Sequence, residues 1–74
     1  MKVQVKTENG GALNMRTSPN KLASVFAQIP NGALLEAPDG IGKEWTKIIY
    51  KETPGYVMTK FLSDSQKTFT KDDL

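Results

Sequence analysis

The side chains of this sequence that could do chemistry suit a binding surface better than a catalytic centre. The chain contains no histidine and no cysteine, which excludes Cys–His and Ser–His nucleophilic sites and the usual zinc sites. Its acidic residues lie mostly in or beside expected turns, and no two have a spacing that marks a general acid–base pair. We therefore expect a non-enzymatic protein with no cofactor and no metal site.

Three aromatic residues are candidates for ligand contacts. Trp45 offers a flat indole and one N–H donor, so it could stack on a sugar or a peptide, or it could simply cover one end of the fold. Tyr50 could also contact a ligand, although strand packing with the hydroxyl at the surface is the favoured interpretation. Phe61 could line a groove or cap the core.

Two polar residues are candidates on a different segment. Asn14 and Arg16 alternate with Leu13 and Met15, so they leave the core face of an expected strand. Asn14 could hydrogen-bond a ligand backbone or organise the loop at 17–21. Arg16 could pair bidentately with a ligand carboxylate, or it could be a solvated charge or a brace for the loop.

Short segments with strand patterns must position these side chains. They alternate apolar and polar residues or are rich in β-branched and aromatic residues, and no helix of ten residues is indicated. The expected strands are 2–6, 12–16, 24–29, 33–37, 45–50 and 55–58. We predict an all-β protein, a small antiparallel barrel of five to six strands, because a barrel leaves the fewest open edges.

The stretch 43–62 contains the clearest hairpin signal. A strand pattern at 45–50 is followed by Pro54 and Gly55, and a second strand pattern begins at Tyr56. Proline fixes φ and glycine tolerates positive φ, so the sequence predicts that the turn lies at 52–55.

Alternation also predicts which side chains form the core. The candidates are the apolar residues on the inward face of each expected strand: Val3, Val5, Leu13, Val25, Ala27, Ile29, Leu34, Ile48, Tyr56 and Val57.

Length, charge and hydropathy indicate one domain with a polar tail. We expect residues 1–62 of the 74 to form the barrel and residues 63–74 to be disordered or loosely attached, with Phe69 as a possible tether through one added strand. We see no signal peptide and no membrane span. The net charge of +2 is too weakly basic to indicate a nucleic-acid partner.

Four blocks occur in a fixed order: ALNMRTSP at 12–19, IPNG at 29–32, WTKIIY at 45–50 and GYVMTKFL at 55–62. Together they resemble bacterial SH3-like (SH3b) domains. The resemblance implies an SH3-like barrel, with a short 3-10 turn near residues 59–61. The tyrosines that line the polyproline groove of eukaryotic SH3 domains have no counterpart, since Asn14 and Arg16 stand in that region and Phe61 lacks a hydroxyl.

The resemblance also implies a binding module. We expect it to recognise a peptide-like ligand, bacterial cell-wall peptidoglycan first of all, on a shallow groove, and to be a monomer. The groove residues are Asn14, Arg16, Trp45, Tyr50 and Phe61. The alternatives are a protein–protein adaptor in a phage or mobile-element setting and a small-barrel nucleic-acid binder. The location would be the cell wall for a module of a larger exported protein, and otherwise the cytoplasm.

Overall fold

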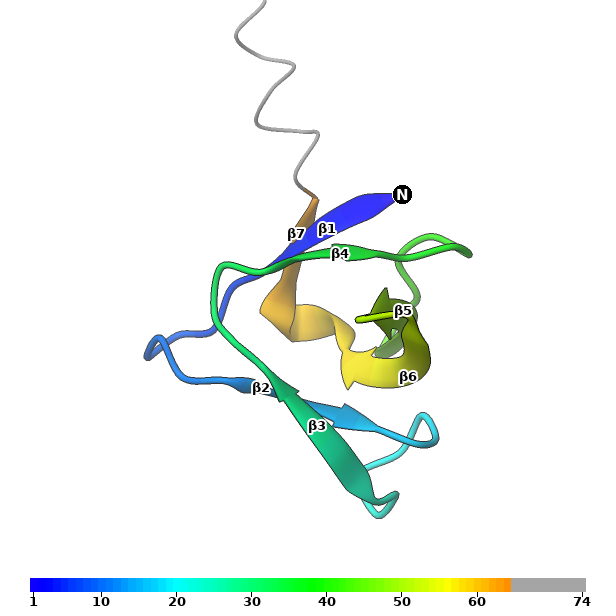
Figure 1. Cartoon of the computed structure of the whole chain (residues 1–74). Helices are drawn as coiled ribbons and strands as arrows, with labels where there is room; N and C mark the ends of the chain where they lie inside the picture. The colour runs from blue at the N-terminus through cyan, green and yellow to red at the C-terminus, as the bar shows by residue number, and fades with distance from the viewer. Residues whose placement is uncertain (65–74) are drawn as a thin grey trace, which may run out of the picture.

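The structure, a computed structural model, describes residues 1–64 and contains a single antiparallel sheet (Figure 1). The expected all-β class is confirmed, but the number of strands is seven and not five or six. They are β1 (Lys2–Val5), β2 (Leu13–Arg16), β3 (Val25–Ile29), β4 (Leu34–Glu36), β5 (Trp45–Tyr50), β6 (Thr53–Met58) and β7 (Leu62–Asp64). One 3-10 helix, η1 (Thr59–Phe61), lies where a 3-10 turn was expected.

The strand order is β3-β2-β6-β5-β4-β1-β7, and the sheet is not closed. Within residues 1–64, β3 pairs only with β2 and β7 only with β1, so these two strands form the edges of the described sheet. The sheet curls strongly, and Figure 1 shows β2 and β3 across from β1 and β4. Curling lets seven short strands bury one shared apolar face.

The core comes from the inward side chains of six strands and the residue after β4. The buried apolar residues are Val3, Val5, Leu13, Met15, Ile29, Leu35, Ala37, Ile48 and Val57. The prediction that Val25 and Leu34 lie in the core is wrong, because their side chains are 43% and 59% exposed. Ala27 and Tyr56 are only partly buried.

Pairing between strands explains both errors. Leu35 lies directly opposite Val3, so it shares the buried face with Val3 and turns its neighbour Leu34 outward. Val25 lies beyond a register shift between Met15 and Arg16 in the β2–β3 ladder. Such a bulge interrupts the alternation, and Val25 is left exposed on an edge strand.

The β5–β6 hairpin turns earlier than the sequence indicates. Tyr50 pairs with Thr53, so Lys51 and Glu52 alone form the turn, with φ of 51° and 67°. Two consecutive positive φ values define the type I′ turn that fits the twist of a two-residue hairpin. The predicted turn at 52–55 is therefore wrong, and Pro54 and Gly55 belong to β6.

Gly55 is in the strand because its side of β6 is crowded. A Cβ atom there would lie 2.6 Å from Met15 Cε and 3.0 Å from Phe26 Cζ. Pro54 pairs with Ile49, next to the closing pair of the hairpin. That position points its nitrogen away from β5, so the missing N–H costs no bond to β5.

The sheet continues past the expected end of the barrel. β7 pairs with β1 through Leu62, Ser63 and Asp64, so two residues assigned to the tail at 63–74 form part of the sheet. The rest of that tail, including Phe69, lies outside the described residues. Within residues 1–64, no helix has the length and hydrophobicity needed to cross a membrane.

Candidate functional site

Strand β2 turns two candidate side chains away from the core. Leu13 and Met15 are buried, whereas Asn14 and Arg16 are half-buried on the other face. Arg16 pairs with Tyr56 on β6, and Tyr56 pairs in turn with Lys47 on β5. Directly paired residues project from the same face of a sheet, so Arg16, Tyr56 and Lys47 form a row across three strands.

A second row lies beside the first. Trp45 on β5 pairs with Met58 on β6. Continuing the antiparallel register of Arg16 and Tyr56 brings Asn14 opposite Met58. The second row on this face therefore consists of Asn14, Met58 and Trp45. The two rows together contain three of the predicted site residues, Asn14, Arg16 and Trp45.

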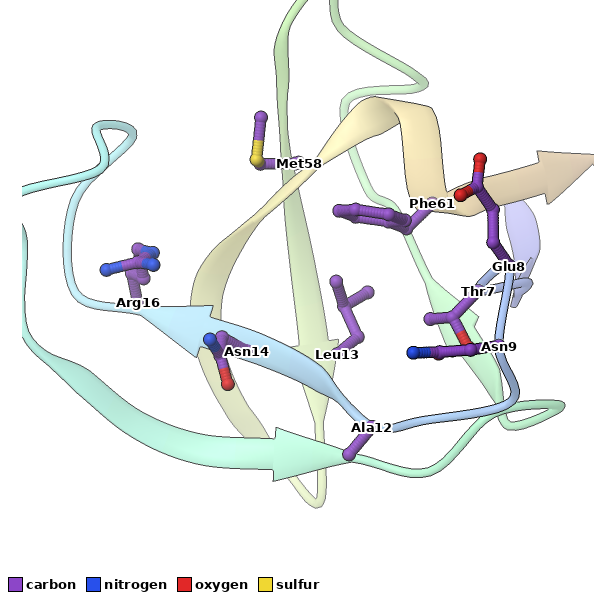
Figure 2. Close-up of a pocket in the computed structure, with 9 residues that line it drawn as sticks. All are labelled: Thr7, Glu8, Asn9, Ala12, Leu13, Asn14, Arg16, Met58 and Phe61. Carbon is purple, nitrogen blue, oxygen red and sulfur yellow. The ribbon is translucent and has the colours of Figure 1, made fainter.

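A hollow of about 390 Å³ opens beside these rows (Figure 2). Figure 2 shows the ring of Phe61 near Leu13 in the middle, with Arg16 on one side and Glu8 and Asn9 on the other. Its lining combines apolar side chains with amides and charges: Thr7, Glu8, Asn9, Ala12, Leu13, Asn14, Arg16, Met58 and Phe61. Trp45 does not line the hollow, but its partner Met58 does.

Phe61 reaches the hollow because η1 is fixed at both ends. The Thr59 N–H donates to the Glu44 carbonyl at 2.9 Å, and the Thr59 hydroxyl lies 2.7 Å from that of Thr46. At the other end, the Lys6 N–H donates to the Phe61 carbonyl at 2.8 Å. Phe61 also packs against the core, so its ring is held in place before any ligand arrives.

Arg16 braces the loop between β2 and β3. Its Nη1 donates to the carbonyls of Lys21 at 2.9 Å and Ala23 at 3.0 Å. Within the same loop, the Leu22 N–H donates to Asn20 Oδ1 at 2.9 Å. The loop-bracing interpretation of Arg16 is confirmed, and the guanidinium keeps further N–H groups on Nε and Nη2 for a ligand.

Asn14 does not organise that loop. Its Oδ1 accepts a hydrogen bond from Gln28 Nε2 at 3.0 Å, which ties β2 to β3. The predicted role of Asn14 in the loop at 17–21 is therefore wrong. Its amide NH₂ remains a donor at the edge of the hollow.

The loop between β1 and β2 supplies polar lining that the sequence reasoning missed. The Thr7 N–H donates to Asn31 Oδ1 at 2.9 Å, and the Gly11 N–H donates to Asn9 Oδ1 at 3.0 Å. These bonds hold Glu8 at the hollow. The Asn9-Gly10 turn signal could have located Glu8 and Asn9, because it brings the end of β1 back toward β2.

Tyr50 lies apart from the other four candidates. It is two residues from buried Ile48 on β5 and therefore points to the core side. It packs against the core and lines a second hollow of about 340 Å³ with Phe26 and Lys51. The Lys51 ammonium lies 5.4 Å from the centroid of the Tyr50 ring.

The first hollow is lined by groups that can form hydrogen bonds and apolar contacts. Residues 1–64 contain no group of three or more His, Cys, Asp or Glu side chains that could hold a metal ion. The hollow offers amide and guanidinium donors, one carboxylate and an apolar floor, which suit hydrogen bonding and van der Waals contact.

No protein-family model matches the chain, and no curated protein is significantly similar to it.

Proposed function

We propose that this chain is a non-enzymatic binding module of the SH3b type that recognises a peptide-like ligand, bacterial cell-wall peptidoglycan. The observation that carries the proposal is the meeting of Asn14, Arg16 and Phe61 in one hollow. These residues come from β2 and η1, which are far apart in the sequence.

The SH3-like assignment is supported by the order of the elements. A hairpin with a long loop, β2–β3, is followed by the tight β5–β6 hairpin, and a 3-10 helix separates the last two strands. The single antiparallel sheet is not closed, but its curl brings β2 and β3 across from β1 and β4, which is compatible with an SH3-like fold. The four sequence blocks that resemble the family fall on β2, the turn after β3, β5, and the segment from β6 to β7.

The lining of the hollow suits a peptide backbone. Peptide groups need both donors and acceptors, and the Asn14 NH₂ and the Glu8 carboxylate supply one of each. Leu13, Met58 and Phe61 provide an apolar floor for small side chains. Wall peptides combine backbone amides, small aliphatic side chains and carboxylates, so each part of the lining has a counterpart.

The site is shallow and open, so the affinity of a single module is expected to be modest. A short ligand buries little area and loses conformational freedom on binding. Tight attachment to a wall would come from many repeated sites or from a second binding domain on the same protein.

An amide chemical-shift titration with solubilised peptidoglycan fragments tests the proposal. We expect shifts to cluster on Asn14, Arg16 and Phe61 and to be absent around the second hollow. No shifts at millimolar ligand would contradict the proposal and favour the protein–protein adaptor.

A pair of variants tests the extent of the groove. Trp45→Ala should weaken binding to fragments, because Trp45 extends the row of Asn14 and Met58. Tyr50→Phe is the control on the other side of β5, and it should bind like the original protein. Unchanged binding by a folded Trp45→Ala variant would remove Trp45 from the site.

A further inference from the structure

We infer that the hollow beside β2 selects a short peptide that carries both a free ammonium group and a free carboxylate. The ammonium lies toward Glu8, and the carboxylate lies toward Arg16, with Lys47 farther along the same row of side chains. This inference rests on the proposed function and adds the ligand's end groups and its direction.

The acidic end of the hollow is a single carboxylate. Glu8 lines the hollow on the side opposite Arg16 (Figure 2), and no ion pair joins Glu8 to another residue within 1–64. Its neighbour Asn9 uses Oδ1 to accept the Gly11 N–H. The Glu8 carboxylate is therefore the acceptor that a ligand ammonium would meet at this end.

The basic end of the hollow is Arg16, and a second cation, Lys47, lies outside the lining in the same row of side chains. Arg16 and Lys47 lie on either side of Tyr56, which pairs with both of them. Arg16 uses Nη1 for the loop carbonyls but keeps donors on Nε and Nη2. Lys47 is half-buried, and no ion pair joins it to another residue within 1–64. A carboxylate at this end meets the Arg16 guanidinium, and the Lys47 ammonium adds a second, more distant positive charge.

Between the two ends, the floor consists of Leu13, Met58 and Phe61. A charged ligand side chain would lose hydration there without gaining a partner. Small aliphatic side chains such as that of alanine have no such hydration to lose, and they gain apolar contact with the floor. The hollow therefore matches a peptide with charge only at its ends and alanine-like residues between them.

Binding of tetra-alanine in four forms tests this inference: with both ends free, N-acetylated, C-amidated, and blocked at both ends. Calorimetry or chemical-shift titration at low salt gives the four affinities. Each block should weaken binding about two- to five-fold, the range for one exposed ion pair. The difference should shrink as salt is added.

Two variants assign the ends without disturbing the loop brace of Arg16. Glu8→Gln should weaken binding of the free peptide and abolish the effect of N-acetylation. Lys47→Gln should reduce the effect of C-amidation. Glu52→Gln and Lys51→Gln make the same charge changes at the remote β5–β6 turn, and they should leave all four affinities as they were.

The outcomes separate this inference from the proposed function. Equal affinities for the four forms would overturn the inference while peptide binding stands. Binding of peptidoglycan fragments but of no form of tetra-alanine would overturn the ligand class named here. Failure of both probes would overturn the proposed function as well. An N-acetylation effect that survives Glu8→Gln would overturn the placement of the ammonium at Glu8.

Discussion

The hydroxyl oxygens of Thr46 and Thr59 lie 2.7 Å apart, and this contact joins the middle of the sheet to the start of η1. Thr46 is 1% exposed, the one buried polar side chain within residues 1–64. Its Oγ1 also accepts the Gly42 N–H at 3.1 Å. One buried hydroxyl thus ties the loop before β5 to the helix that carries Phe61.

Replacing this hydroxyl should destabilise the fold. Thr46→Val keeps the shape of the side chain but leaves the Gly42 N–H and the Thr59 hydroxyl without their partner. We expect a loss of about 1 to 3 kcal/mol in the free energy of unfolding, the cost of removing one partner from a buried hydrogen bond. Urea denaturation measures it.

The exposed Thr53 provides the matched control. Thr53→Val makes the same chemical change at the first residue of β6, and it should leave the free energy of unfolding nearly unchanged. Equal effects of the two substitutions would mean that the Thr46–Thr59 contact contributes nothing specific.

The β5–β6 turn should be open to stabilisation. Lys51 and Glu52 both have positive φ, a conformation that costs side chains with a Cβ about 1 kcal/mol or more per residue. Replacing the pair with Asn-Gly, the preferred type I′ sequence, should raise the free energy of unfolding by about 1 kcal/mol. Thermal and urea denaturation measure the change.

A substitution in the opposite direction checks the same turn. Glu52→Val places a β-branched residue at φ of 67°, where crowding is worse, and it should lower stability. A hairpin that turns at Pro54 and Gly55 instead would make both substitutions nearly neutral.

Gly55 should not accept a larger residue. Gly55→Ala would bring the new Cβ to 2.6 Å from Met15 Cε and 2.8 Å from Met15 Cγ, so buried Met15 must move. We expect a destabilisation of about 1 to 3 kcal/mol from overpacking. A double-mutant cycle with Met15→Ala checks the cause, because the two losses should be less than additive.

Glu36 should give the protein an acid-sensitive contact. The hydrogen bond and charge of the Met1 ammonium, whose nitrogen lies 2.8 Å from Glu36 Oε2, lower the pKa of Glu36 below its ordinary value of 4.5. A lowered pKa in the folded state adds stability above the ordinary pKa, and this stability is lost as the pH falls through the lowered value.

Carboxyl chemical shifts measured against pH should therefore place the Glu36 midpoint below 4.5. Glu36→Gln should make stability fall less steeply on acidification. Because Glu36 is exposed on the surface, the effect should be small and should decrease with added salt. A midpoint at the ordinary value would show that the ion pair does not form in solution.

The sequence alone determined the strand character of the chain and part of the core. Period-two alternation placed Val3, Val5 and Leu13 inside, and it turned Asn14 and Arg16 outward, as the structure has them. These features are local, because successive side chains of a strand must point to opposite faces.

Alternation could not choose between adjacent apolar residues. Both Leu34 and Leu35 fit an inward position, and only the pairing of Leu35 with Val3 decided which one is buried. The hairpin turn was misplaced for a similar reason. Pro54 and Gly55 are the usual turn residues, but crowding by Met15 and Phe26 required Gly55 inside β6, and the turn moved to Lys51 and Glu52.

The candidate site also depends partly on local sequence patterns and partly on the tertiary structure. Local patterns selected Asn14, Arg16 and Phe61 one by one, but only the curl of the sheet and the anchoring of η1 brought them to one hollow with Glu8. The same geometry separated Tyr50 from them. Side-chain type and direction are set by neighbours in the sequence, whereas proximity depends on strand register and on contacts between distant segments, which no local pattern specifies.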